Sequence, residues 1–280
     1  MKLLNRFKLP QALVNAIRND PYTNGGADYS VTTLLDPPRV VALSRKHHNE
    51  LEGDVSDNVW SLYGQIVHSI IERANTGVGE SEIRFFGNVD NVRVSGQVDF
   101  LHDKTITDFK FVTAYKFKDG KAPRNFEEQL NCYAALARLN GRSIDKLELV
   151  GLLRDWSKLE AKRDSRYPQS QVIVVNVPLW PEKLALDFIK ERVRLHESAK
   201  KDLPECSDEE RWAKPPVYAV MMPGRIKAVK LHDTESEAKG HAKNLLGSKV
   251  EYRPGENIRC ENYCEVSLKC DQFKKLKETV

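Results

Sequence analysis

Two carboxylates and one ammonium group are placed to share a site on neighbouring strands. Asp99 closes a G-x-x-D run, and a D-x-K tripeptide formed by Asp108 and Lys110 begins nine positions later. Alternation along a strand puts Asp108 and Lys110 on one face, and a hairpin partner can present Asp99 beside them. Because adjacent carboxylates repel each other when ionised, Mg²⁺ or Mn²⁺ is their natural partner. The pattern predicts hydrolysis of a phosphodiester, with Lys110 orienting or deprotonating the attacking water.

The alternative is that the tripeptide has no catalytic role, since a D-x-K tripeptide on a strand is more often an exposed ion pair. Three further features favour catalysis. His68 and Glu72 lie one turn apart on a predicted helix before the strands, and Gln129 and Tyr133 lie one turn apart on a predicted helix after them. The third feature is the order of these four motifs within about 70 residues.

This combination resembles the RecB-like branch of the PD-(D/E)XK nucleases, which includes the nuclease domains of RecB and AddB and many phage exonucleases. The resemblance covers residues 61–135 closely. It implies an α/β restriction-endonuclease-like core, with a mixed central sheet flanked by helices. Val98 stands where the superfamily name has proline, a departure that is frequent in this branch.

The resemblance also implies roles for individual residues. It assigns metal binding to His68, Asp99, Asp108 and the backbone carbonyl of Phe109. It assigns the catalytic set to Asp99, Asp108, Lys110, Gln129 and Tyr133, the last two being thought to contact DNA and steady the site. Glu72 follows the histidine as a helper.

A second candidate site lies near the C-terminus, where Cys260, Cys264 and Cys270 form C-x3-C-x5-C. The spacing is similar to that of three cysteines which, with one N-terminal cysteine, hold a [4Fe-4S] cluster in AddB-type relatives. No cysteine precedes the prolines of segment 30–39, so Cys206 is the candidate fourth ligand, for a cluster or for a structural Zn²⁺. The alternative is that these thiols bind nothing. Cys132 is expected to be merely buried.

Basic and aromatic side chains alternate between two predicted strands, which suits contacts with a DNA backbone and with bases. A solvated charged loop is the equal alternative. The candidate DNA-binding residues are Arg154, Lys158, Arg163 and Arg166, with Lys162 beside them and Trp156 and Tyr167 interleaved.

The elements that must position these groups follow from hydrophobic periodicity. Helices are expected at 9–19, 59–75, 125–140, 181–200 and 234–246, and Ser30 is placed to cap a short helical turn. Strands are expected at 81–87, 92–103, 104–112, 146–156, 170–180 and 217–222. We divide the chain into an N-terminal helical segment 1–58 packing on the core, a nuclease core 59–200 and a cysteine-containing extension 201–280.

Composition limits the other possibilities. The 280 residues are 40% hydrophobic and 30% charged, with a net charge of +4, which is compatible with a phosphate-bearing partner. No apolar run is long enough to span a bilayer and no signal-peptide core follows the N-terminus, so we expect a cytoplasmic protein of a bacterium or a phage-infected cell, without a membrane partner. The five cysteines do not suggest a disulfide framework.

We therefore expect a Mg²⁺- or Mn²⁺-dependent deoxyribonuclease, by analogy an exonuclease, in DNA recombination, repair or phage DNA metabolism. One alternative is a DNA-binding or structural subunit in which the nuclease fold is inactive; another is an interaction module stabilised by zinc or a cluster. Since no G-x-x-x-x-G-K-[ST] motif is present, unwinding requires a partner such as a helicase. A single-strand annealing protein is another expected partner, and relatives also form ring-shaped homo-oligomers.

Overall fold

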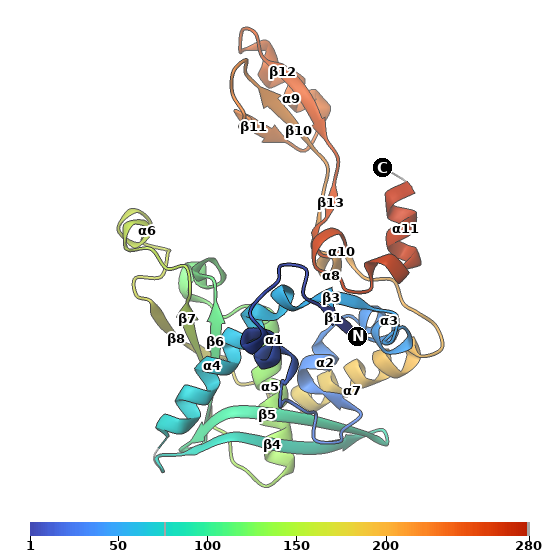
Figure 1. Ribbon diagram of the computed structural model, residues 1–280. Helices are drawn as coiled ribbons and strands as arrows, with labels where there is room; N and C mark the ends of the chain where they lie inside the picture. Colours follow the sequence, from blue (N-terminus) through green and yellow to red (C-terminus); the bar gives the residue numbers. More distant parts are fainter. Residues whose placement is uncertain (76, 279–280) are drawn as a thin grey trace. The chain divides into compact units, whose positions relative to one another are not determined.

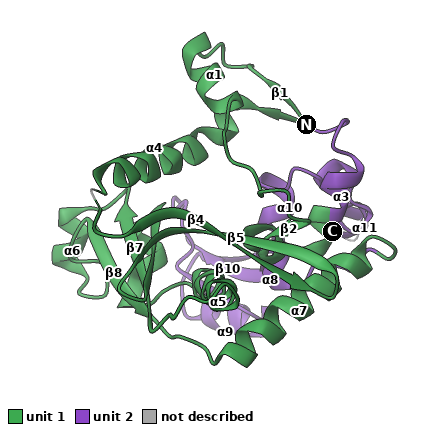
Figure 2. Ribbon diagram, turned by 90° about the horizontal axis from the view of Figure 1, so that it is seen from below, with its two compact units in different colours: residues 1–41, 52–202 green, residues 42–51, 203–280 purple. Residues whose placement is uncertain are grey.

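The chain forms two compact units in the computed structural model, which describes residues 1–75 and 77–278 (Figure 2). The first unit consists of residues 1–41 and 52–202, and the second of residues 42–51 and the chain from Leu203 onward. The predicted N-terminal segment 1–58 is thus divided between the two units, with most of it in the unit that holds the central sheet.

A six-stranded mixed sheet forms the centre of the first unit (Figure 1). Strand β4 pairs along one edge of β5, so β6 and β2 share the opposite edge of β5, with β6 near its C-terminal end and β2 near its N-terminal end. The β6–β7 and β2–β5 pairs are parallel, and the others are antiparallel. The strands are β2 (Tyr29–Ser30), β4 (Glu80–Val89), β5 (Val92–His102), β6 (Thr105–Val112), β7 (Lys146–Leu153) and β8 (Val172–Val177).

Helix α5 (Arg124–Leu139) packs on one face of this sheet and carries the main hydrophobic core. All its residues from Gln129 to Ala137 are buried, because α7 (Glu182–Ala199) and α2 (Val31–Leu35) cover the side that faces away from the sheet. Ser30 caps α2 as predicted, accepting a hydrogen bond from the Thr33 N–H at 3.1 Å.

Helix α4 (Val59–Ala74) lies on the opposite face of the sheet from α5 (Figure 2). Its apolar residues follow helical spacing as predicted, yet none of them is buried. A small cluster formed by Val14, Ile17 and Val55 packs against Val59 and Leu62 at the start of the helix. Helix α4 therefore leaves large apolar side chains exposed to solvent.

Short elements complete the first unit. They are β1 (Lys2–Leu4), which pairs in parallel with β3 (Glu52–Asp54), helices α1 (Gln11–Arg18) and α6 (Lys158–Arg163), and the 3-10 segments η1 (Val55–Asn58) and η2 (Ala114–Gly120). Helix α3 (Pro38–Lys46) spans the boundary between the units. Because α6 lies within the predicted basic loop, that segment is partly helical.

The second unit contains a three-stranded antiparallel sheet with the order β11-β10-β12, against which α9 packs. Its elements are β10 (Val217–Met221), β11 (Lys230–His232), α9 (Glu235–Lys243) and β12 (Lys249–Arg253). The cysteines belong to segments around α8 (Asp208–Arg211), β9 (Ala213–Lys214), β13 (Glu256–Asn257), α10 (Ile258–Asn262), η3 (Ser267–Lys269) and α11 (Asp271–Glu278). Within 1–75 and 77–278, no helix has both the length and the apolar character needed to cross a bilayer.

Candidate metal and catalytic site

Two tight hairpins bring three acidic residues to one place in the sheet. Strands β4 and β5 are joined by the two-residue turn Asp90–Asn91, and β5 and β6 by the turn Asp103–Lys104. All four turn residues have positive φ, between 43° and 65°, as hairpins with two-residue turns of type I′ require. Counting outward from the turns places Glu82 opposite Asp99, and Asp99 opposite Asp108, so all three side chains share one face.

The site forms where β5 and β6 separate. Their pairing runs from His102 to Phe100 on β5 and ends there, one residue before Asp99. Beyond this point β6 continues beside β7. The Asp99 carboxylate fills the fork by accepting a hydrogen bond from the Phe109 N–H through Oδ2 at 2.7 Å. At the fork, side chains thus take the place of the backbone hydrogen bonds of an ordinary sheet.

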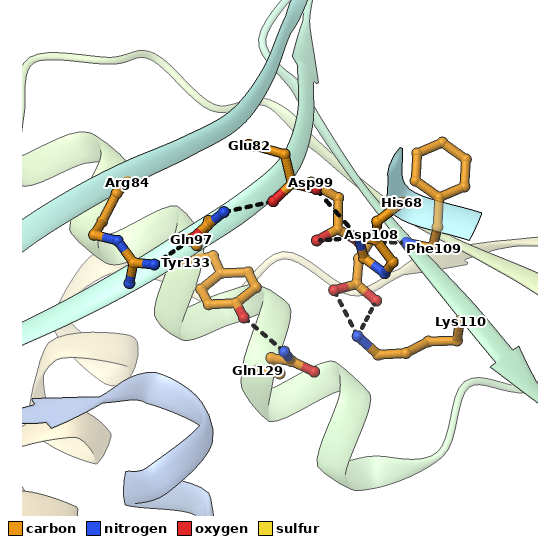
Figure 3. A network of polar contacts seen from close by, with 10 residues as sticks. All are labelled: His68, Glu82, Arg84, Gln97, Asp99, Asp108, Phe109, Lys110, Gln129 and Tyr133. Atoms are coloured by element: carbon orange, nitrogen blue, oxygen red, sulfur yellow. Dashed lines mark hydrogen bonds and ion pairs between the residues drawn. The ribbon is translucent and has the colours of Figure 1, made fainter. Parts of the chain in front are cut away.

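Glu82 is a site residue that sequence analysis missed. The β4–β5 ladder has partners at Ser81 and at Ile83 but skips Glu82, whose φ is +54°. This left-handed conformation is unfavourable for a non-glycine residue and is typical of functional sites. A chain of hydrogen bonds holds the side chain, since Gln97 Nε2 donates to Glu82 Oε2 at 2.5 Å and Arg84 donates to Gln97 (Figure 3).

His68 reaches the same place from helix α4. Its Nδ1 lies 3.2 Å from Glu82 Oε1 and 3.5 Å from Asp99 Oδ1. The donor atoms of His68, Glu82 and Asp99 all lie within 4.8 Å of one another, close enough to hold one metal ion. These three half-buried or buried side chains therefore form a nitrogen and oxygen donor set suited to a divalent cation.

Asp108 and Lys110 point from β6 toward helix α5 (Figure 3). Lys110 Nζ donates to Asp108 Oδ1 at 2.8 Å and lies 2.6 Å from Oδ2, outside hydrogen-bond geometry for the second oxygen. Asp108 is 1% exposed, and among the described residues its Oδ2 is a buried acceptor without a hydrogen-bond partner. The Lys110 ammonium is the charged neighbour of this carboxylate, and the carboxylate keeps further acceptor capacity with which it could bind a second cation.

Burial and charge repulsion shift the proton affinities here. Burial, and then the Asp108 carboxylate, raise the pKa of Asp99 to about 7. The hydrogen bond with Glu82 raises the pKa of His68, although burial opposes it. Burial also disfavours ionised Glu82, but hydrogen bonds from His68 and Gln97 outweigh it and lower the pKa of Glu82. At neutral pH without a cation, the site thus favours a partly protonated Asp99.

The predicted Gln129 and Tyr133 pair lies beneath Asp108 on α5. Gln129 Nε2 donates to the Tyr133 hydroxyl at 2.6 Å, and both side chains are at most 8% exposed. Burial and the carboxylates of Asp108 and Asp99 raise the pKa of Tyr133 well above its ordinary value. Gly96 permits this packing, because a Cβ atom there would lie 2.8 Å from the Tyr133 ring. The pair lies on the α5 side of the site and is buried.

Glu72 and Phe109 lie in surroundings that differ from those predicted. Glu72 is exposed, and the carboxylate beside His68 comes from Glu82 instead. The helical spacing that put Glu72 one turn from His68 was correct, but strand β4 supplies the nearer acid. At Phe109 the contact with the site is made by its N–H, so the carbonyl stays a predicted ligand.

The basic segment after β7 separates into paired and unpaired cations. Arg163 pairs with Glu160 and Arg166 with Asp164, whereas no carboxylate in the described chain contacts Arg154. Trp156 and Tyr167 are half-buried against the core, and their polar atoms are bonded to Pro168 O and the Ser157 N–H. Lys158 begins α6 and is exposed.

All four candidate cysteines belong to the second unit. Two hydrogen bonds join the Cys206 backbone to the side chain of Gln272, which places the Cys206 segment beside the start of α11 and Cys270. Burial, and then the neighbouring thiols Cys264 and Cys270, raise the pKa of Cys260. Burial likewise raises the pKa of Cys264. Cys132, by contrast, is buried in α5 as expected.

Comparison with known proteins gives little beyond this geometry. No family model and no curated protein matches the chain. A solved structure of a protein named SSO0001 is 18% identical over 65% of this chain and 84% of its own, with a TM-score of 0.45. A protein from Eubacterium rectale, named a putative exonuclease, is 14% identical over 50% of this chain and 54% of its own, with a TM-score of 0.33. Since both TM-scores are below 0.5, the function is argued from the site.

Proposed function

We propose that this chain is a divalent-metal-dependent nuclease that hydrolyses DNA phosphodiesters, with a core of the PD-(D/E)XK type. The observation that carries the proposal is the fork between β5 and β6, where Asp99 and Asp108 converge with His68, Glu82 and Lys110. Three acids beside one lysine need a counter-charge, and a hard cation provides it. A phosphodiester is a substrate that brings its own anionic oxygens to such a site.

The side chains of the site have different proposed roles. His68, Glu82, Asp99 and Asp108 would hold Mg²⁺ or Mn²⁺, which supplies electrostatic stabilisation of the phosphoryl oxygens. Lys110, 19% exposed in its side chain, is placed to orient a water molecule and to neutralise charge that develops on the phosphate. Gln129 and Tyr133 keep Asp108 and Asp99 from shifting toward α5. We propose exonuclease action, by analogy with the resembling family.

The test is digestion of end-labelled linear DNA and of covalently closed circular DNA with Mg²⁺, with Mn²⁺ or with a chelator. We expect degradation of the linear DNA alone, and only with a metal. Asp108→Asn and Lys110→Met are expected to lower the rate roughly 10²- to 10³-fold, the range for removing one preorganised electrostatic group.

Matched controls lie on the same hairpin. Asp103→Asn and Lys104→Met change the same residue types on the exposed turn between β5 and β6 and are expected to keep the wild-type rate. Melting temperatures identify any variant that loses its fold. If the wild-type protein binds DNA but cleaves none of it with either metal, the nuclease proposal fails and an inactive DNA-binding subunit replaces it.

We propose in addition that Cys206, Cys260, Cys264 and Cys270 bind a structural [4Fe-4S] cluster or Zn²⁺. Support comes from four thiols within one unit, from the two hydrogen bonds between Gln272 and the Cys206 backbone, and from the neighbouring thiols Cys264 and Cys270 that raise the pKa of Cys260. Four thiolates suit either group. The site would stabilise the C-terminal segment and take no part in cleavage.

A further inference from the structure

An exposed aromatic row runs along the start of helix α4. Trp60 and Tyr63 have ring centroids 5.7 Å apart, and Tyr63 meets the Phe111 ring edge-on at 5.9 Å. Trp60 is 56% exposed and Tyr63 43% exposed, which is unusual for side chains that gain so much from burial. A row of large exposed rings, held at fixed spacing, is a surface for binding flat apolar groups.

Cations without carboxylate partners border this row. The Arg154 guanidinium lies over the Trp60 ring at 3.6 Å, and the Lys116 ammonium lies over the Phe126 ring of α5, outside the row, at 5.1 Å. Within the described chain, no carboxylate pairs with Arg154 or Lys116. Burial, and then the charges of Arg154 and Lys110, lower the pKa of Lys116, so both cations lie close enough to Lys116 to repel its charge.

The row shares two elements with the metal site. Phe111 follows Lys110 on β6 and faces the other side of the sheet, toward α4. Tyr63 precedes His68 by five residues on α4, an interval that advances about 8 Å along the helix and turns the side chain by about 140°. Helix α4 thus carries both Tyr63 of the row and His68 of the metal site, and a strand whose phosphate lies at His68 meets the helix that presents the row.

We propose that Trp60, Tyr63 and Arg154 form a stacking platform for unpaired bases of the DNA strand being cleaved, so that the enzyme acts on single-stranded ends. The proposal rests on the proposed nuclease function, because the metal site defines where the strand lies. Rings stack on any base, and the unpaired cations Arg154 and Lys116 neutralise the backbone phosphates. An interior base pair of a duplex could not use the platform, since both of its faces are already stacked on its neighbours.

The test measures binding without cleavage. A labelled single-stranded oligonucleotide is titrated with protein in the presence of a chelator, and fluorescence anisotropy gives Kd. The variants are Trp60→Ala, Trp60→Phe, which keeps a ring, and Ile70→Ala, which shortens another exposed apolar residue of α4 away from the row. A second oligonucleotide of equal length and charge carries abasic sites in place of the bases.

We expect Trp60→Ala to weaken binding of the normal oligonucleotide roughly ten-fold, the effect of one lost stacked base, with Trp60→Phe and Ile70→Ala close to wild type. On the abasic oligonucleotide, wild type and Trp60→Ala should bind equally, because no base is left to stack.

Three results would overturn the platform: an unchanged Kd for Trp60→Ala, an equal loss on normal and abasic strands, or tighter binding of duplex than of single strands. Each can be told apart from failure of the nuclease proposal, since cleavage of linear DNA with Mg²⁺ is measured separately on the same proteins. A dead enzyme with base-dependent binding would keep the platform and refute only the catalytic role.

Discussion

The two candidate metal sites of this chain differ in what holds their ligands in place. At the fork between β5 and β6, two hairpin turns and a ladder of strand pairs fix the acids, and hydrogen bonds from Gln97 and the Phe109 N–H orient them. At the cysteine site the ligands lie on short segments around α10 and α11. Within the described chain, the donor atoms of His68, Glu82 and Asp99 lie within 4.8 Å of one another, whereas the cysteines form no such group.

The difference indicates different uses of a metal. A site that the fold assembles beforehand can release and rebind Mg²⁺ or Mn²⁺ during turnover, because its geometry does not depend on the ion. A site whose ligands come from short segments gains its order from the ion, so that binding and folding are one event. Under the proposed function, the site at the fork would serve chemistry and the cysteine site would serve stability.

The largest expected effect is loss of the second site. A Cys260→Ser, Cys264→Ser double variant should lose its bound iron or zinc and make the C-terminal unit sensitive to protease, because structural zinc binding is worth about 10–16 kcal/mol in small domains. Metal analysis and limited proteolysis measure both effects. Cys132→Ala, in α5, is the matched control and should keep the metal. The proposed structural metal site is wrong if the wild-type protein carries neither iron nor zinc and the double variant resists protease as well as the wild type does.

The next effect concerns the acid beside His68. Glu82→Gln should weaken Mn²⁺ binding roughly 10- to 100-fold, because it replaces a charged ligand that is held by Gln97 and His68. Isothermal titration calorimetry measures the affinity. Glu72→Gln alters the same residue type on α4, at an exposed position, and should leave the affinity unchanged. Equal losses in both variants would return the helper role to Glu72.

The smallest effect is a pH dependence of stability in metal-free protein. The pKa of Asp99 is about 7 in the folded chain, above its ordinary value of 3.8, so the folded state holds this proton more tightly than the unfolded state. Stability is therefore greatest below about pH 4 for this group and falls as the pH rises through 7. Asp99→Asn removes that loss and should melt a few degrees higher than wild type at pH 8.

Thermal unfolding by circular dichroism from pH 5 to pH 8 measures this effect. Added Mn²⁺ should raise the melting temperature of wild type at pH 8 and leave that of Asp99→Asn nearly unchanged. The opposite result would be a melting temperature of metal-free wild type that rises between pH 5 and pH 8 relative to that of Asp99→Asn. It would show that repulsion between the carboxylates does not destabilise the folded state.

Local sequence determined much of the central sheet and of the candidate site on it. The positions of α4, α5 and strands β4 to β8 follow from apolar periodicity, because the spacing of a helix or a strand is written into neighbouring residues. The shared face of Asp108 and Lys110 follows from strand alternation in the same way. Even Glu82 could have been found, since the Asp90–Asn91 turn fixes the register that places it opposite Asp99.

Tertiary structure decided which of these residues meet and which remain free. Glu72 and Glu82 are both plausible partners for His68 in sequence, and only the packing of α4 near β4 selects Glu82. Trp156 and Tyr167 are half-buried against the core, whereas Trp60 and Tyr63 stay exposed on a helix whose periodicity suggested burial. The reason is that burial depends on the summed surfaces of distant segments, which no local pattern records.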